Sequence, residues 1–441
     1  MDTRRFSGVI IAAALLQLSA APMLRAQTNT ENFSQFEFNF NNPGARATGI
    51  GGAFISIADD ATAAEANPAG LTALLRPEFS FELKGVQLRR DVANFSHTGT
   101  ADNFSLVSRE FDNALIIPSF GSFVIPLGNV VGSLFRHELV NFETSYYTKG
   151  SYVPPAPGTA AGDGAFFFPV RSDLSMKVVN WGAALSYKVS RGFSLGLSGG
   201  LSQLSVASTL SRYYLEIFDT GNLANESRID DQGNSYFLNV GLLVRPLENL
   251  ALGAIYKHRP SFELEHQLLV RDFPTDTIIS QAINFNVPSS IGIGISYRPV
   301  DVLTLSFDVS RVSYSDMTKE FVVVFGENAV SPSDYAVDDA FEFHAGIEYV
   351  LLLRSMGVVF RGGFYNEADS RIAFTGDPAS PGDPDRAFVR RTQAALFQTG
   401  DSDLHYTVGV GLLISNAFQL DLAGNLSSGS DEVVGSFVVR F

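Results

Sequence analysis

From residue 78 to the C-terminus, the chain alternates apolar and polar residues with a period of two. The pattern is clearest in Asp301–Ser310, where one face carries Leu, Phe and Val and the other carries Thr, Ser and Asp. A period of two is typical of a β-strand with one apolar face, and about fourteen such segments can be counted. One of them is expected to cover Asp301–Met317. The sequence therefore predicts an all-β fold.

The connections between these segments alternate in length. Short turns, such as Pro126–Asn129 and Ser190–Gly192, alternate with long segments rich in Gly, Pro, Ser and Asp, such as Arg89–Asp112 and Ser370–Gly400. Short turns at one end and long loops at the other are typical of an outer-membrane barrel. A soluble β-sandwich has no reason to sort its loops in this way. We therefore predict a transmembrane antiparallel β-barrel over residues 78–441.

The stretch Gly44–Leu75 does not alternate. It opens with glycines and other small residues, which allow backbones to pack closely. Ala58–Ala66 has good helix propensity, and Asn67 and Pro68 suit the N-cap and the first position of a second helix. We expect residues 27–77 to form a hatch, containing short helices, inside the barrel.

The N-terminal residues 1–26 have the pattern of a secretory signal peptide, with Arg4 and Arg5 before the apolar run Val9–Leu16. Their removal takes away three arginines and one aspartate and changes the formal charge from −15 to −17. So acidic a chain is not expected to bind nucleic acid, which requires a basic face. The chain has no cysteine, so disulfides and thiolate metal sites are excluded.

Charged side chains in the predicted strands should point into the lumen. A charge at mid-bilayer on the lipid face costs up to about 2–4 kcal/mol. This argument assigns one group of residues to the lumen: Asp308, Glu342, His344, Glu348, Arg361 and Asp421.

Catalytic and cofactor chemistry finds little support. Gly196–Gly200 has the G-x-S-x-G spacing of a nucleophile elbow, but Ser198 lies within a predicted strand, whereas that motif requires a sharp strand–turn–helix. The six histidines are scattered without ligand spacing, and the acidic loop pieces lack EF-hand spacing. We expect no enzyme activity, no cofactor and no metal.

Aromatic residues gather in one long loop region. Tyr146 and Tyr147 precede a run of three phenylalanines, Phe166, Phe167 and Phe168. Grouped apolar residues in a loop can mark a contact surface. They would either capture an apolar ligand at the outer face or pack loop on loop.

The hatch residues resemble the N-terminal signature of FadL-type outer-membrane transporters. The similarity lies in residues 45–54 and 58–63 and in Asn67–Leu71, and later strands fit more weakly. The resemblance implies a fourteen-stranded barrel that is closed by a hatch. It also implies import of long-chain fatty acids or other hydrophobic compounds, with a lateral exit at a kinked strand. Asn67, Pro68 and Ala69 match the hatch motif and would take part in gating.

Two further sites are expected besides the residues that match the hatch motif. A kink could lie at Pro118 or Gly121, because proline cannot donate to a strand ladder. The C-terminal Phe441 resembles the signal that directs barrels to the outer membrane.

These observations predict passive uptake of long-chain fatty acids or other hydrophobic small molecules across the outer membrane of a Gram-negative cell. The expected partners are the hydrophobic ligand, outer-membrane lipid and the barrel-assembly machinery. The alternative is an interaction or shuttle component of a protein-secretion or surface-attachment system.

Overall fold

The computed structural model describes residues 27–28, 31, 33, 40–100, 103–155, 157, 165–271, 275–325, 329–353, 356–378, 384–415 and 417–441. The predicted signal peptide, residues 1–26, lies outside the described residues. Among the described residues, no helix is long and apolar enough to cross a membrane.

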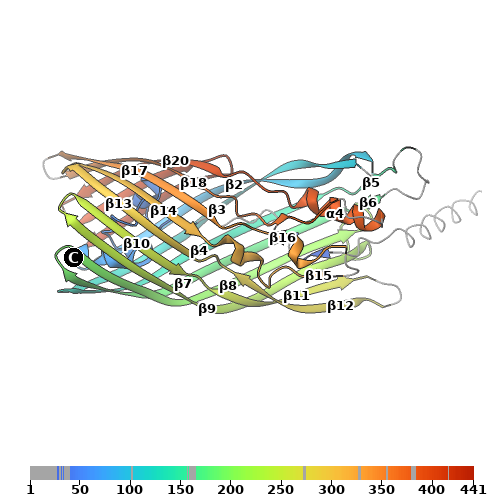
Figure 1. Cartoon of the computed structure of the whole chain (residues 1–441), viewed down its shortest axis with the longest axis horizontal. Helices are drawn as coiled ribbons and strands as arrows, with labels where there is room; N and C mark the ends of the chain where they lie inside the picture. The colour runs from blue at the N-terminus through green and yellow to red at the C-terminus, as the bar shows by residue number, and fades with distance from the viewer. Residues whose placement is uncertain are drawn as a thin grey trace, which may run out of the picture.

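The described chain forms a closed antiparallel barrel of fourteen strands, which confirms the predicted fold (Figure 1). Two strands are interrupted, so that β10 continues as β11 and β12 continues as β13. The sheet closes where β22 pairs with β2, from Glu78 opposite Arg440 to Leu88 opposite Ser430. In chain order the wall consists of β2 (Glu78–Thr100), β3 (Asn103–Leu127), β4 (Val130–Thr148), β7 (Val170–Ser190), β8 (Phe193–Tyr213), β9 (Leu223–Leu247), β10 (Leu250–His258) with β11 (Ser261–Val270), β12 (Thr277–Asn286) with β13 (Ser290–Val300), β14 (Leu303–Val312), β17 (Ala340–Leu353), β18 (Met356–Glu367), β20 (Asp403–Ile414), β21 (Phe418–Leu426) and β22 (Ser430–Arg440).

The two ends of the barrel differ. Short turns and the C-terminus lie at one end, which we call the turn end, and the long connections lie at the other, the loop end (Figure 1). Besides the wall strands, the described part of the loop end carries one α-helix, α4 (Pro384–Leu396), and two 3-10 helices. It also carries five short strands: β5 (Ser151–Val153), β6 (Ala165–Phe167), β15 (Val324–Phe325), β16 (Tyr335–Ala336) and β19 (Ala373–Phe374). The 3-10 helices are η3 (Tyr314–Thr318) and η4 (Pro332–Asp334).

Several predicted boundaries were wrong. β2 and β3 continue through most of the expected loop Arg89–Asp112, because they pair with each other far beyond the neighbouring strand β22. The strand expected over Asp301–Met317 ends at Val312, where η3 turns Tyr314 into the apolar interior. The helix α4 lies within the expected loop Ser370–Gly400.

The wall changes character along its length. In β8, Leu195, Leu197 and Leu201 face outward and are exposed, while Ser194, Gly196 and Ser198 face inward. Closer to the loop end of the same strand, Leu204, Val206 and Leu210 face inward and are buried. The alternation thus reverses its phase: the turn-end half is apolar outside, and the loop-end half is apolar inside. Only the first half has the surface that a bilayer requires.

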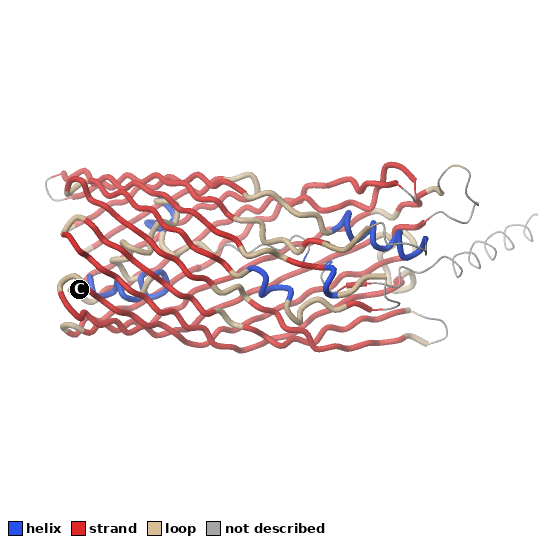
Figure 2. Tube along the Cα trace, in the orientation of Figure 1, coloured by secondary structure: helices blue, strands red, loops and turns tan. Residues whose placement is uncertain are grey.

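The hatch fills the turn-end half. Its helices are α2 (Ala45–Gly49), α3 (Ala63–Ala66) and the 3-10 helix η2 (Pro68–Ala73), which lie inside the barrel near the turn end (Figure 2). Of the helix expected over Ala58–Ala66, only α3 forms. Before the hatch, β1 (Gln27–Thr28) pairs with β15 at the loop end.

We predict that Phe441 is needed for efficient assembly. Its backbone N–H donates to the carbonyl of Pro77 at 3.0 Å, and its side chain is exposed at the end of the closing strand. Phe441→Ser should lower the amount of folded, heat-modifiable barrel in the membrane several-fold. Phe418→Ser is the matched control, because Phe418 is also exposed and pairs with Val439 beside the same end. Equal yields of the two variants would contradict the prediction.

Candidate functional site

The residues Asn67, Pro68 and Ala69 bind the hatch to the wall. Asn67 caps η2 as predicted: its side-chain oxygen accepts a hydrogen bond from the Ala69 N–H at 3.2 Å. Its amide nitrogen donates to the carbonyls of Ile55 at 2.8 Å and of Leu242, in β9, at 3.2 Å. The hydroxyl of Ser186, in β7, donates to the carbonyl of Pro68. Asn67 therefore joins two parts of the hatch to each other and to the barrel.

Glycines in the wall make room for this contact. A Cβ atom on Gly196 of β8 would lie 2.1 Å from the Ala69 nitrogen, and one on Gly241 of β9 would lie 2.1 Å from Asn67 Oδ1. Across the lumen, a Cβ on Gly346 of β17 would lie 2.3 Å from the Ile50 carbonyl oxygen. Any larger side chain at these three positions would collide with atoms of the hatch. These inward-facing glycines are thus the positions at which the hatch packs directly against the wall, and we call them the hatch seats.

Three of the predicted lumen residues form one ion-pair network with the hatch. Arg46 of α2 contacts Glu348 at 2.9 Å, and Arg361 contacts Glu348 and Asp421 at 2.7 Å each. The Arg361 side chain is almost completely buried, so its guanidinium depends on these two carboxylates for compensation. The network ties α2 to β17, β18 and β21.

The other three predicted lumen residues are also buried or half-buried inside the barrel. Asp308 accepts a hydrogen bond from the Ile55 N–H at 2.8 Å. His344 donates from Nδ1 to the Gly51 carbonyl at 2.7 Å. Glu342 lies nearer the loop end and accepts from the Tyr314 hydroxyl at 2.6 Å. Their partners are hatch backbone and a loop residue.

The sequence reasoning missed a second fully enclosed ionic contact. Glu65 of α3 is fully buried and lies 3.6 Å from Lys257, near the end of β10, and 2.9 Å from Arg259, the residue after that strand. Asn239 of β9 donates to the same carboxylate at 3.1 Å. Two signals were present: one acidic residue in an alanine-rich run, and two bases two positions apart in a strand, which places them on one face.

The wall is incomplete between β3 and β4. Their ladder runs from Leu127–Val130 up to Phe120–His137. Beyond Phe120, the described pairs of β3 are with β2, and those of β4 are with β7. We call this gap the seam. Pro118 lies two residues beyond the last rung, within a register shift of the β2–β3 ladder, whereas Gly121 is still paired with both neighbours.

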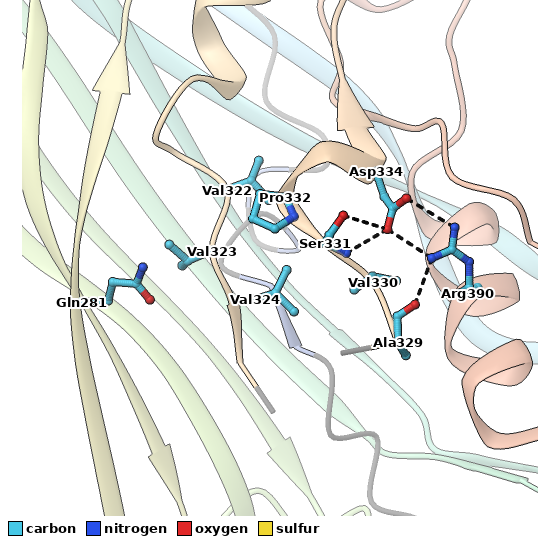
Figure 3. A pocket seen from close by; sticks show the side chains of 10 residues that line it. All are labelled: Gln281, Val322, Val323, Val324, Ala329, Val330, Ser331, Pro332, Asp334 and Arg390. Carbon is cyan, nitrogen blue, oxygen red and sulfur yellow. Dashed lines mark hydrogen bonds and ion pairs between the residues drawn. The ribbon is translucent and has the colours of Figure 1, made fainter. Parts of the chain in front are cut away.

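A second opening lies at the loop end. A pocket of about 550 Å³ is lined by Val322, Val323 and Val324 and by the segment 329–332. Gln281 of β12 lies on one side and Arg390 of α4 on the other (Figure 3). The surroundings are apolar apart from Gln281, Ser331 and the ion pair of Arg390 with Asp334, at 3.1 Å.

This ion pair is stable at neutral pH. Burial alone would raise the pKa of Asp334, but hydrogen bonds from Arg390 and Ser331 outweigh it and hold the pKa of the carboxyl below its usual value. Asp334 therefore remains charged and keeps α4 against η4. The rim of the pocket is fixed by this contact.

The aromatic residues predicted for outer ligand capture do not form one surface. Phe167 is fully buried and packs on Phe104 and Phe388. Tyr146 is buried, while Tyr147 is exposed and packs edge-on against Phe218. Phe168 contacts Tyr214. The side chain of Phe166 lies outside the described residues.

Residues 24–368 match the protein family described as "Outer membrane protein transport protein (OMPP1/FadL/TodX)". The chain belongs to this family. No curated protein sequence matches it.

Solved structures show the same fold at low sequence identity. A Pseudomonas aeruginosa FadL homologue is 13% identical with a TM-score of 0.61, and covers 92% of this chain and 99% of its own. The Ralstonia pickettii toluene transporter TbuX is 15% identical with a TM-score of 0.56, covering 91% and 99%. The Pseudomonas putida toluene transporter TodX is 14% identical with a TM-score of 0.58, covering 91% and 99%.

Membership of the FadL/TodX family places the barrel in the outer membrane of a Gram-negative cell. The turn end is therefore periplasmic and the loop end extracellular. The family consists of transport channels rather than enzymes. Ser198 faces the lumen and accepts a hydrogen bond from Asn239 at 3.1 Å. Among the described residues, no group of three potential metal ligands comes together.

We predict that the double change Asn67→Ala, Pro68→Ala disturbs ligand passage or makes the barrel leak. It removes the η2 cap and the hydrogen bonds to Ile55 and Leu242, while the ladders of the wall remain. Heat-modifiable migration should show an intact barrel, and uptake of small polar solutes should rise. Unchanged uptake and permeability in a stable double variant would mean that this motif only fills space.

Gly196→Ala should push the hatch away from β8, because the added methyl carbon would lie 2.1 Å from the Ala69 nitrogen. We expect greater permeability to small polar antibiotics with the barrel still assembled. Gly132→Ala is the control: Gly132 lies in β4, and its added Cβ would meet nothing within 4 Å. Equal permeability of the two variants would refute a hatch seat at Gly196.

Proposed function

We propose that the protein takes up small hydrophobic molecules, including long-chain fatty acids, passively across the outer membrane. The observation that carries this proposal is the inverted wall. The extracellular half of the barrel has an apolar interior that includes Phe142, Met176, Leu204 and Phe262, although water surrounds its outside. A polar pore would carry the opposite pattern.

The extracellular pocket is the proposed site of ligand capture. Its three consecutive valines, Val322–Val324, lie in the segment that covers the apolar interior. An apolar ligand gains roughly 0.8 kcal/mol for each CH₂ that leaves water, so partitioning alone can drive it inward. Two of the structurally similar proteins, TbuX and TodX, are toluene transporters, and CymD is described as a monoaromatic hydrocarbon channel.

The seam is the proposed outlet, with Pro118 at the kink. The hatch is held at two separate parts of the wall by ion pairs, Glu65 with Arg259 and Arg46 with Glu348, and by close glycine contacts, which oppose its leaving the barrel. The seam opens just above the hatch level, at the position where β3 and β4 part. A ligand from the apolar interior would pass there into the bilayer rather than through the periplasmic end. The alternative role in protein secretion or surface attachment is not favoured by the family match.

Val324→Trp should reduce uptake of hydrophobic ligands, because Val324 is half-buried in the pocket wall and the larger ring would fill the opening. We expect a several-fold slower uptake of labelled fatty acid or aromatic hydrocarbon by cells with equal amounts of folded barrel. Val189→Trp is the control, since Val189 is exposed at the periplasmic end of β7. Mass spectrometry of lipid extracted from the purified wild type should identify the bound compound. Absence of any apolar ligand, with uptake unaffected by Val324→Trp, would overturn the proposal.

A further inference from the structure

The outer surface beside the seam carries a hollow of about 690 Å³. The strand register defines it. On one outward row, Leu134 of β4 pairs with Ala183 of β7, and Ala183 pairs with Gly199 of β8. The small residues leave a depression between the large, exposed side chains of Leu134, Trp181 and Leu201. Since Leu134 is 67% exposed on the membrane-facing half, the hollow opens to the bilayer.

The next outward row marks the edge of the bilayer core. It joins Arg136 of β4 to Trp181 of β7 and then to Leu201 of β8, which in turn pairs with Tyr236 of β9. Above this row the outward residue of β8 is Gln203, and the apolar surface of β8 ends. Trp and Tyr gather where acyl chains meet headgroups. Trp181 and Tyr236 are 52% and 73% exposed, which suits that level.

Two cations and one carboxylate lie at and just above this level on the lipid-facing side. The guanidinium of Arg136 lies 5.9 Å from the centre of the Trp181 ring, and Arg136 also contacts Glu138. Lys177, two outward rows above Trp181 on β7, lies 3.2 Å from the same carboxylate. Its side chain is 45% exposed, whereas that of Glu138 is fully buried. The carboxylate is thus covered, and a positive group faces outward. The higher outward residue Glu143 limits this positive region from above.

We propose that this surface binds one anionic lipid of the outer membrane. An acyl chain lies in the hollow over Ala183 and Gly199, and the phosphate of the headgroup contacts Lys177 and Arg136. The bilayer is the medium that covers the hollow, and a basic side chain near the headgroups attracts anionic lipid. The lipid would occupy the outer side of the seam independently of the transported compound.

The chain offers a specific probe, because Trp181 is its only tryptophan. The purified full-length barrel would be placed in phosphatidylcholine bilayers that contain a small fraction of brominated lipid, which quenches nearby tryptophan. We expect brominated phosphatidylglycerol to quench Trp181 at about fivefold lower mole fraction than brominated phosphatidylcholine. That ratio corresponds to about 1 kcal/mol for one basic side chain near an anionic lipid.

Two variants and one control decide the outcome. Lys177→Gln should remove most of the preference for the anionic lipid, while quenching by phosphatidylcholine persists. Gly199→Leu should fill the hollow and weaken quenching by both lipids. Lys188→Gln makes the same charge change at the periplasmic end of β7 and should leave the preference intact. Equal quenching by the two lipids in the wild type, or equal preference in Lys177→Gln and Lys188→Gln, would overturn the proposal. Heat-modifiable migration verifies that each variant is folded.

Discussion

Within a bilayer, every backbone N–H and C=O must find a partner in the protein, and this constraint governs the wall of the barrel. The pairing of β22 with β2 satisfies it by removing the last free edges. The seam is the local exception, and its residues show how the exception is tolerated. Pro118 has no N–H to leave unpaired, and its carbonyl oxygen accepts a hydrogen bond from Arg136 across the gap. One side chain thus replaces a missing rung.

The lumen of this closed barrel is filled by two different sets of residues, one in each half of the barrel. In the periplasmic half, polar and glycine positions of the wall receive the backbone of the hatch. In the extracellular half, apolar side chains of the wall pack against the segment around Tyr314 and Phe321. The boundary between the fillings lies near the level at which the seam opens. An apolar chamber above a polar, fixed hatch is the arrangement on which the proposed lateral outlet at the seam rests.

The hatch is fixed by electrostatics as well as by shape. Removing one partner of a buried ion pair typically costs about 3–5 kcal/mol, because the remaining charge is left uncompensated. Arg361 and Glu65 each occupy such a position, on different sides of the lumen. The hatch could leave only after Glu65 parted from Arg259 and Arg46 parted from Glu348, whereas the pairs of Arg361 join wall strands to one another. The close contacts at Gly196 and Gly346 add a steric requirement at the same two sides of the hatch.

Hydrophobic periodicity and helix capping are local properties, so the amino-acid sequence was enough to predict about fourteen strands and the Asn67 cap of the hatch. It also assigned Glu348, Arg361 and Asp421 to one interior, since charge is costly against lipid. The sequence could not predict which of these charges meet, which glycines contact the hatch, or where β3 and β4 part. Those features join residues far apart in the chain, and their identity depends on strand register and closure. The change of apolar face within β8 is present in the sequence as a pattern. Its cause becomes clear only from the barrel, in which one half of the strand faces lipid and the other half encloses the apolar interior.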